Sequence, residues 1–253
     1  MGGKGNTRYL KRLAAPKLIH IQRKIGKFFT KARAGPHNKE ESLPLLHIVR
    51  DILNLGANAR EARKIIKQGD VIVDGVPRTD HKFPVGIMDV IKIPKMDKHY
   101  RILPVEGKGF YPVEIPKKEA DFKLVRIENK STVKGGHIQL NLHDGRNLLL
   151  KVKDPRNPEE GKAYKTMDVL KISVPGQEIK GHVPLKEGSY GIIISGHNFG
   201  QMGTITNINK RFGINASIIG LKNKKNEQLE TEYEYMFIGG KGSSEITLPE
   251  ETV

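Results

Sequence analysis

Four cationic side chains share one face of a predicted helix over residues 58–69. Arg60, Arg63, Lys64 and Lys67 stand at i, i+3, i+4 and i+7, a spacing that places them on one stripe of an α-helix. Cations this close repel one another by roughly a few tenths of a kcal/mol per pair in an isolated helix. A phosphate backbone turns that repulsion into attraction. The stripe therefore favours a polyanionic ligand, with an ordinary solvated face as the alternative.

The N-terminal segment is a second concentration of cations. Residues 1–44 carry eleven Lys and Arg side chains against only Glu40 and Glu41, which gives a net charge of +9. Leucine, isoleucine, phenylalanine and tyrosine are interleaved with these cations, unlike in a pure lysine tail. We therefore expect residues 1–41 to form an extended arm that is poorly ordered alone and becomes ordered against a large charged surface. A solvated, disordered terminus is the alternative.

The charge of the whole chain also favours a polyanion. Its 253 residues hold 44 Lys and Arg against 28 Asp and Glu, a net charge of +16. The far end reverses the sign, because residues 227–253 carry seven glutamates and one lysine, a net of −6. This acidic end either docks on a basic neighbouring protein or is simply solvated. Glu230, Glu232 and Glu234 alternate with Thr and Tyr, as on the outer face of a strand.

Signatures of catalysis and metal binding are missing from the sequence. It contains no Gly-x-x-x-x-Gly-Lys-Ser/Thr, no Gly-x-Gly-x-x-Gly after a strand, no His-Glu-x-x-His and no Gly-x-Ser-x-Gly. The absence of cysteine removes thiolate ligands, disulfides and thiol nucleophiles. The nine histidines include no adjacent pair and no i, i+4 pair, so a metal site would need distant segments. We expect no catalytic residue, no metal and no cofactor.

One aspartate has a setting in which a nucleophile can be imagined. Asp144, within His143-Asp144-Gly145-Arg146, has a basic residue close by, as does the aspartate of a pseudouridine synthase. A β-turn explains it better, because Asp-Gly between two apolar runs is the hairpin signal itself. The sequence also lacks the alternating βαβ pattern of a modification enzyme's catalytic domain.

Targeting segments are not readable in the sequence. No stretch approaches the roughly 18 apolar residues of a membrane span, and the N-terminus lacks the apolar core of a secretory signal. The expected location is the cytoplasm. The length favours several small domains, each with its own pattern.

Residues 42–94 read as a small α+β module. Apolar residues from Leu45 to Leu53 fall at helical spacing, with Gly56 where a terminating glycine belongs. A second helix starts at Asn58, the first residue of a capping-box-like pattern, and ends at Gly69. Asp74-Gly75 suits a tight type I′ hairpin turn, and a further strand follows over residues 90–93.

The rest of the chain reads as short strands. Residues 95–178 hold five apolar runs separated by Gly-Gly, Asp-Gly and Asp154–Pro158 turn or loop signals, typical of a small β-barrel or sandwich. Residues 179–225 contain two strands around a loop whose turn glycines are Gly196, Gly200 and Gly203, which we interpret as an SH3-like barrel. Residues 226–253 form an acidic C-terminal segment. The fold class is α+β, with several domains.

The segment from Asn58 to Gly75 resembles the RNA-binding module named after bacterial small-subunit ribosomal protein four. The family pattern couples a basic Arg-x-x-Arg-type helix to a Gly-Val-x-Val-Asn-Gly-type hairpin, and Asp74 stands here where Asn is commoner. The resemblance implies that helix and hairpin form one RNA-facing groove. Residues 188–208, centred on Ser195 to Gly203, are similar to a KOW motif.

The order of motifs extends the resemblance along nearly the whole chain. Residues 10–17, Gly35-Pro36-His37, the stretch 74–89 and residues 237–242 follow the order of the archaeal and eukaryotic small-subunit ribosomal protein four, e-type. The family implies a non-catalytic structural protein of the small ribosomal subunit. Its partners would be small-subunit ribosomal RNA and neighbouring ribosomal proteins, with no membrane and no small-molecule substrate. The ending soon after Pro249 favours the archaeal type.

Candidate RNA contacts come from the arm, the module and the KOW-like segment. Folded RNA presents its backbone and 2′-hydroxyls, so cationic arms and small modules suit it. The candidates are Arg8, Lys11, Arg12, Lys17, Arg23, Lys24, Lys27, Lys31, Arg33, Arg60, Arg63, Lys64, Lys67, Arg78, Lys82, His197, Lys210 and Arg211. An RNA-modifying enzyme with the same module, or a transcription or processing factor whose KOW-like hairpin binds protein, remains the alternative.

Overall fold

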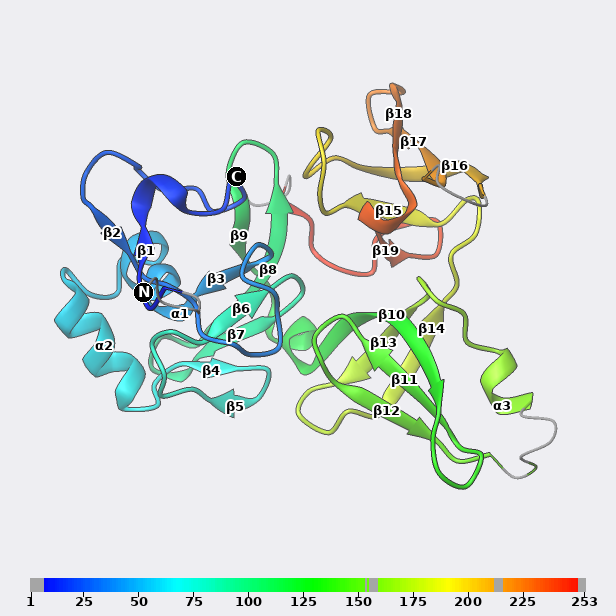
Figure 1. The fold of residues 1–253 in the computed structure, drawn as a ribbon, viewed down its shortest axis with the longest axis horizontal. Helices are drawn as coiled ribbons and strands as arrows, with labels where there is room; N and C mark the ends of the chain where they lie inside the picture. Colours follow the sequence, from blue (N-terminus) through cyan, green and yellow to red (C-terminus); the bar gives the residue numbers. More distant parts are fainter. Residues whose placement is uncertain (1–6, 153, 155–158, 212–215, 250–253) are drawn as a thin grey trace, which may run out of the picture.

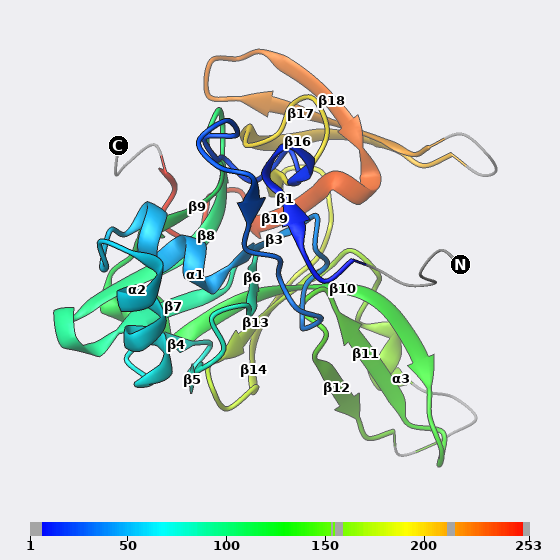
Figure 2. The ribbon, with the colours of Figure 1, turned by 60° about the vertical axis from the view of Figure 1, so that its left-hand side comes forward.

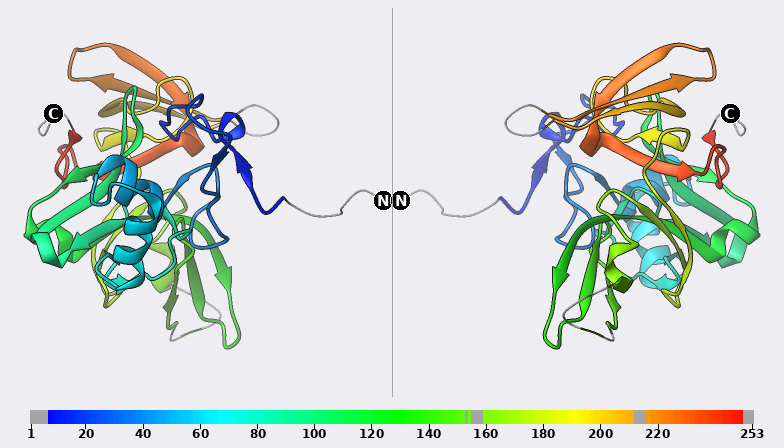
Figure 3. Two further views of the ribbon diagram at one scale, coloured as in Figure 1. Left: turned by 90° about the vertical axis from the view of Figure 1, so that its left-hand side faces the viewer. Right: turned by 90° about the vertical axis from the view of Figure 1, so that its right-hand side faces the viewer.

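Three antiparallel sheets of five strands each, with two two-stranded pairs, make up the fold. The computed structural model describes residues 7–152, 154, 159–211 and 216–249. Most of the loop expected at Asp154–Pro158 lies outside the described residues. Figures 1 and 2 show the three sheets as separate bodies around a common junction, and in Figure 3 the third sheet (orange) lies at the top and the second (green) at the bottom.

The first sheet has the strand order β5-β4-β7-β8-β9 and packs beside the helices. The predicted hairpin is confirmed: Asp74 and Gly75 have φ values of 49° and 75°, as a type I′ turn requires. The elements are β3 (Ser42–Pro44), α1 (Leu45–His47), η2 (Ile48–Ile52), α2 (Ala59–Lys67), β4 (Ile72–Val73), β5 (Val76–Pro77), β6 (Pro84–Gly86), β7 (Val90–Ile93), η3 (Pro94–Met96), β8 (Lys98–Val105) and β9 (Gly109–Glu114).

The first predicted helix differs from its pattern. α1 is a single turn that continues as the π-helix η2, and the widened turn still directs Ile48 and Val49 into the core. The chain reverses at Asn54, with φ of 51°, and not at the expected terminator Gly56. Gly56 is required for space, because a Cβ there would lie 2.9 Å from the backbone nitrogen of Ala62.

The second sheet has the order β12-β11-β10-β13-β14. Its long strand β10 pairs with β11 at one end and β13 at the other, with a register shift between Ile127 and Asn129. Strands between residues 122 and 183 form this one five-stranded sheet, in the region where a small β-barrel or sandwich was expected over residues 95–178. Its elements are η4 (Lys117–Asp121), β10 (Phe122–Thr132), β11 (Ile138–Leu142), β12 (Asn147–Leu150), α3 (Glu159–Lys162), β13 (Val169–Ser173) and β14 (Ile179–Val183).

The third sheet has the order β18-β17-β16-β15-β19. Gly196 and Gly200 have positive φ in the β15–β16 loop, as expected. Gly203 is not a turn glycine: it pairs within β16, where a Cβ would lie 2.2 Å from the carbonyl oxygen of Lys222. The elements are β15 (Tyr190–Ile193), β16 (Met202–Asn209), β17 (Ile218–Asn223), β18 (Gln228–Glu232), η5 (Tyr233–Tyr235) and β19 (Met236–Gly240).

Strand pairing assigns several strands to other sheets than the sequence predicted. β8 and β9, expected in the central unit, extend the first sheet to residue 114. β14, expected in the third unit, pairs with β13. β18 and β19, expected in a C-terminal extension, complete the third sheet. Antiparallel partners that are distant in sequence leave no local signal in the composition.

We call each sheet with its neighbouring helical turns the first, second and third unit. The described part of the arm, residues 7–41, packs on the first unit and is not extended. β1 (Leu10–Lys11) pairs with β2 (Phe28–Phe29), and the short η1 (Arg12–Ala14) lies between them. Leu10, Ala15, Ile19 and Phe29 are buried in the main core. The apolar residues interleaved with the cations are thus core residues of the folded chain, and Figure 1 shows the arm above α1.

One apolar core joins the arm and parts of all three sheets, since Phe29, Ile91, Val169 and Phe237 belong to the same buried cluster. The second sheet has a cluster of its own around Val125 and Leu170. Among the described residues, no helix is both long and apolar enough to cross a membrane.

Candidate nucleic-acid interface

Helix α2 presents the predicted cationic face. Its start is set by Asn58, whose side-chain oxygen accepts hydrogen bonds from the backbone N–H groups of Arg60 and Glu61, at 2.9 and 3.0 Å. Ala62 and Ile66 are fully buried on the inner side. The outer side carries the four cations of the stripe, all exposed: Arg60, Arg63, Lys64 and Lys67.

These four cations have no carboxylate partner among the described residues. The nearest acid in sequence, Glu61, is engaged elsewhere, since its carboxylate accepts from the backbone N–H of Ala57 at 2.9 Å and from the amide of Asn58. The face thus keeps its full positive charge for an external anion. A row of unpaired cations at this spacing suits successive phosphates.

Several arm cations bind within the chain. The guanidinium of Arg23 donates to the carbonyls of Leu13, Ala15 and Pro16, at 3.3, 3.0 and 3.3 Å, which closes the turn of η1. That of Arg12 donates to the carbonyl of Gln22 at 2.9 Å. These contacts hold the fold of the arm, a role that its composition did not reveal.

Two further cations of the arm make contacts near its ends. Lys31 donates to the carbonyl of Thr7. Arg33 forms an ion pair with Asp80 at 3.0 Å, and its backbone N–H donates to the carbonyl of Lys82 at 2.9 Å. The remaining arm candidates, Arg8, Lys11, Lys17, Lys24 and Lys27, are exposed.

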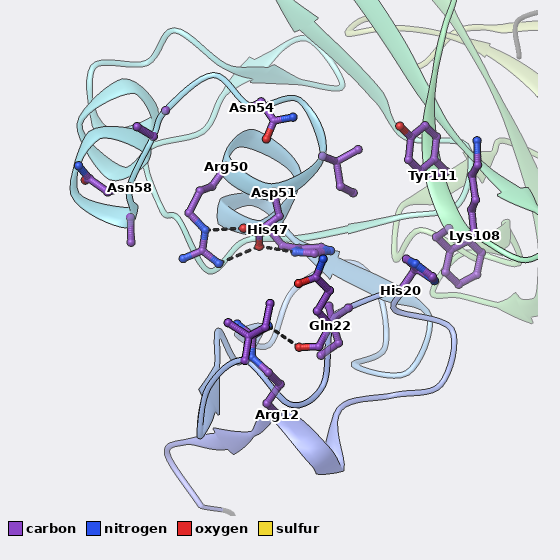
Figure 4. A pocket seen from close by; sticks show the side chains of 17 residues that line it. Arg12, His20, Gln22, His47, Arg50, Asp51, Asn54, Asn58, Lys108 and Tyr111 are labelled. Carbon is purple, nitrogen blue, oxygen red and sulfur yellow. Dashed lines mark hydrogen bonds and ion pairs between the residues drawn. The ribbon is translucent and has the colours of Figure 1, made fainter.

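A groove of about 990 Å³ lies between the arm, the first helical segment and the β8–β9 hairpin. Figure 4 shows Arg12 and Gln22 of the arm on one side and Lys108 and Tyr111 of the hairpin on another, with Asn58 of α2 at the far end. The groove therefore leads to the N-terminus of α2. Its cations and the positive end of that helix favour an anionic ligand.

The floor of the groove holds a fixed ionic triad. Asp51 accepts from His47 Nδ1 at 2.7 Å and from Arg50 Nε at 2.6 Å, and Figure 4 shows the three side chains together. Partial burial opposes ionisation of Asp51, but the hydrogen bonds from His47 and Arg50 outweigh it and lower the pKa of the carboxyl. Asp51 is therefore ionised at neutral pH and orients Arg50.

Sequence reasoning missed part of this groove. His20, Arg50, Lys108 and Tyr111 line it but were not among the candidates. Lys108 had a weak signal in the sequence, because it stands between two glycines, Gly107 and Gly109, as in a turn. Both glycines have positive φ in the β8–β9 turn. The position of Arg50 depends on where η2 ends. The apolar pattern predicted a helix that continues to Gly56, whereas η2 ends at Ile52.

The hairpin turn is not among the residues that line this groove, whereas the resemblance implied one RNA-facing groove for helix and hairpin. A Cβ on Gly75 would lie 2.9 Å from Pro175, so the turn packs against the second unit. The Asp74 carboxylate faces inward, where it accepts from the backbone N–H of Val90 at 2.9 Å and from Lys123 at 2.8 Å. Nearby Arg78, a candidate contact, stacks over Phe83 at 4.3 Å.

Lys123 lies at the centre of a buried ionic cluster. Its ammonium is 0% exposed and pairs with Asp74 and Asp89 of the first unit and with Asp144 of the second. His37 of the arm contacts Asp89 at 3.0 Å. Burial would raise the pKa of Asp89, but the interactions with His37 and Lys123 outweigh it and lower that pKa. The cluster therefore joins the arm and two units.

Asp144 has no access to a substrate. Its side chain is 1% exposed and lies 3.0 Å from Lys123 and 3.3 Å from Arg146. Burial opposes its ionisation, but the charge of Lys123 outweighs burial and lowers its pKa. The residue occupies the turn between β11 and β12, so the β-turn interpretation fits.

The candidates of the third unit lie apart from α2, as Figure 1 shows for the surrounding strands. His197 is exposed on the β15–β16 loop. Lys210 lies 5.5 Å from the ring centroid of Tyr233, and the backbone N–H of Arg211 donates to Ser217. The structure thus distributes the predicted site residues over separate surfaces.

Comparison with known proteins gives a family for the chain. The RS4NT domain model matches residues 4–40, the S4 domain model matches 51–91, and the model of ribosomal family S4e matches 96–179. Small ribosomal subunit protein eS4 of Aeropyrum pernix is 50% identical over 250 residues, which cover 99% of this chain and 98% of the relative. The chain belongs to the ribosomal S4e family.

Further relatives of this S4e chain agree. Small ribosomal subunit protein eS4 of Methanocaldococcus jannaschii is 48% identical over 240 residues, covering 95% of this chain and 97% of the relative. The crystal structure of the 30S ribosomal protein S4e from Thermoplasma acidophilum matches with a TM-score of 0.66 and 31% identity, covering 79% of this chain and 96% of that chain. The expected resemblance to the e-type family is confirmed, as is a mixed fold with an S4 domain and several β-sheets.

Proposed function

We propose that this S4e chain is a structural constituent of the small ribosomal subunit, located in the cytoplasm, and that it binds and stabilises folded ribosomal RNA. The observation that carries the proposal is the unpaired cationic face of α2. This face lies inside the segment that matches the S4 domain, in a chain similar to eS4 proteins over nearly its full length. Neighbouring ribosomal proteins are the further partners.

The binding mode follows from the kinds of contact that the surface offers. Lysine and arginine side chains on α2 and along the groove of about 990 Å³ meet phosphates. Such contacts position a protein on RNA and carry little base specificity. Folded RNA is read mainly by shape, so the spacing of the cationic surfaces decides which RNA fits.

A finer division of the chain belongs to this proposal. The third sheet would be the SH3-like unit, with residues 188–208 as a KOW-type hairpin and His197, Lys210 and Arg211 as its RNA contacts. Support comes from the pairing of β15 with both β16 and β19, which brings the ends of the segment together. The first and second units would then span residues 42–116 and 117–183.

Neither an RNA-modifying enzyme nor a transcription or processing factor is favoured. The relatives named above are small ribosomal subunit proteins. The imagined nucleophile Asp144 is buried and paired with cations. A catalytic role would need another site.

Cosedimentation with small ribosomal subunits tests the proposal. Full-length protein should be recovered at one copy per subunit after a high-salt wash, and a variant with Arg60, Arg63 and Lys67 changed to glutamine should be recovered less. Recovery with RNA polymerase, or covalent modification of bare RNA by the purified chain, would overturn the proposal.

A further inference from the structure

Two aromatic rings of the arm are left at the surface. Tyr9 is 52% exposed and Phe28 is 53% exposed, and their rings meet edge to face with centroids 5.5 Å apart and an interplanar angle of 77°. Aromatic side chains are usually buried, because burial removes a large apolar area from water. An ordered pair of exposed rings therefore offers an apolar surface for a partner.

The strand register fixes the direction of these rings. Leu10 pairs with Phe29 and Lys11 pairs with Phe28, and successive side chains of a strand point to opposite faces. Leu10 and Phe29 are buried in the main core, so Lys11 and Phe28 face outward. A slip of one residue would expose the buried pair. Burial of Leu10 and Phe29 in the core thus keeps the Phe28 ring on the outer surface.

Exposed apolar area is concentrated on this arm. Among the described residues, eight large hydrophobic side chains are exposed, and four of them, Tyr9, Leu13, Ile25 and Phe28, fall between residues 9 and 28. Single exposed hydrophobic residues are normal on a protein surface. Four within one short segment indicate a contact surface.

The charge around the rings identifies the partner. Lys11 faces outward beside Phe28, and the Lys27 ammonium lies 5.5 Å from the Phe28 ring centroid. Arg8 is adjacent to Tyr9, and no Asp or Glu precedes Glu40. The partner must therefore be anionic and must offer flat apolar faces. Unpaired nucleotides combine both properties, whereas the bases of an RNA duplex are stacked inside it.

We propose that the Tyr9–Phe28 face stacks on unpaired bases of RNA, with Lys11 and Lys27 binding the adjacent phosphates. This inference rests on the proposed RNA-binding function and adds the kind of RNA and the residues that recognise it. Lys27 covers the Phe28 ring in the free protein, and a stacking base displaces its ammonium toward the phosphate.

A tryptophan at position 28 reports stacking directly. The chain contains no tryptophan, so full-length Phe28→Trp carries a single indole probe. Adding a non-self-complementary single strand of about ten nucleotides should quench its emission at saturation. A blunt duplex of the same length should leave the emission nearly unchanged. Unchanged emission with bound single strand would overturn the proposal.

A pair of leucine substitutions separates ring stacking from apolar contact. Tyr9→Leu/Phe28→Leu keeps apolar side chains at two exposed positions and should lower single-strand affinity by about ten- to hundredfold, with an unchanged salt dependence and an unchanged melting temperature. Leu149→Ala/Ile179→Ala, at two exposed apolar positions on the second sheet, is the matched control and should not change the ratio of single-strand to duplex affinity. Equal losses in both variants would overturn the proposal.

The outcomes also separate this inference from the proposed function. If the wild-type chain binds neither single strand nor duplex nor ribosomal subunits, RNA binding itself fails. If the wild type binds RNA and the leucine variant binds the single strand equally well, only the stacking inference fails. Loss of the leucine variant from small ribosomal subunits with unchanged RNA affinity would mean that a protein covers the face, which also overturns the inference.

Discussion

The ammonium of Lys123 lies 2.8 Å from the carboxylate of Asp74, although 49 positions separate the two residues. The same ammonium bonds to Asp89 and Asp144, at separations of 34 and 21 positions. One buried side chain of β10 therefore joins the hairpin turn of the first unit to a turn of the second.

Removing this ammonium should destabilise the protein strongly. Lys123→Met leaves three buried carboxylates without their common cation, and removal of one partner of a buried ion pair costs about 3–5 kcal/mol. Urea unfolding of the full chain, followed by circular dichroism, measures the loss. The matched control is Lys92→Met, whose ion pair with Asp121 lies at the surface and should cost less than about 1 kcal/mol. Equal losses would contradict the central role of Lys123.

Acid should weaken the protein through His143. Burial and the charge of Lys123 lower the pKa of this imidazole from 6.5 to about 3, and its Nδ1 accepts from the backbone N–H of Arg126 at 3.1 Å. As the pH falls below 6.5, the unfolded chain takes up a proton that the folded chain does not. Stability present at pH 7 is then lost toward pH 3, by about 1.4 kcal/mol per pH unit.

Unfolding of His143→Gln at several pH values tests this linkage. The variant should show a shallower loss of stability between about pH 6 and pH 4 than the wild type. His20→Gln, at an exposed position, should keep the wild-type slope. A wild-type slope in the His143 variant would show that the imidazole does not couple folding to pH.

The cations of α2 should govern the salt dependence of RNA binding. If about eight phosphates are neutralised, log K falls with log salt at a slope of roughly −6 to −7. Changing Arg60, Arg63 and Lys67 to glutamine should reduce the steepness by about 2 to 3. Filter binding at several salt concentrations measures both slopes.

A control with the same loss of net charge makes that test specific. Lys117, Lys118 and Lys180 are exposed on the second unit, and their replacement by glutamine should change the slope little. If both triple variants weaken RNA binding equally, the affinity depends on the net charge of the protein and not on the cationic face of α2. A wild-type slope near zero would refute the electrostatic mechanism.

A single methyl group should loosen the arm. Gly109 has φ of 73°, and a Cβ there would lie 2.0 Å from the carbonyl oxygen of Leu18. Gly107 in the same turn also has φ of 73°, but nothing lies within 4 Å of its Cβ position. Both alanine variants bear the cost of a left-handed residue, about 1–2 kcal/mol, whereas only Gly109→Ala displaces the arm.

Limited proteolysis before Gly35 measures that displacement. Cleavage should be faster in Gly109→Ala than in Gly107→Ala, and bound RNA should slow cleavage in both. Equal rates in the two variants would mean that the contact of Leu18 with the β8–β9 turn does not hold the arm. Equal rates with and without RNA would contradict RNA contact by the arm.

Local features of the fold were predictable from the sequence. Asn58 and Glu61 mark the start of α2 because capping acts over three residues, and Asp74-Gly75 marks a tight turn because both positions need positive φ. The cationic stripe of α2 follows from helical spacing and is exposed as predicted. Such signals depend on neighbours in the sequence, so they can be read without the fold.

Features that depend on distant contacts were not predictable. The partners of Lys123 come from turns far along the chain, and nothing near Lys123 in the sequence distinguishes it from a surface cation. The groove between Arg50 and Lys108 exists because the β8–β9 hairpin approaches the arm at Gly109. The internal role of Arg23 depends on carbonyls that only the folded arm brings together.

The unpaired edge of the third sheet matters for the free protein, before it binds RNA or a neighbouring protein. β18 is an end strand of that sheet, and an unpaired strand edge can add a strand from another molecule. Glu230 and Glu232 are exposed along this edge, with Thr231 between them half-buried. Carboxylates so placed repel the same edge of a second copy. Pairing of two copies through this edge is therefore disfavoured.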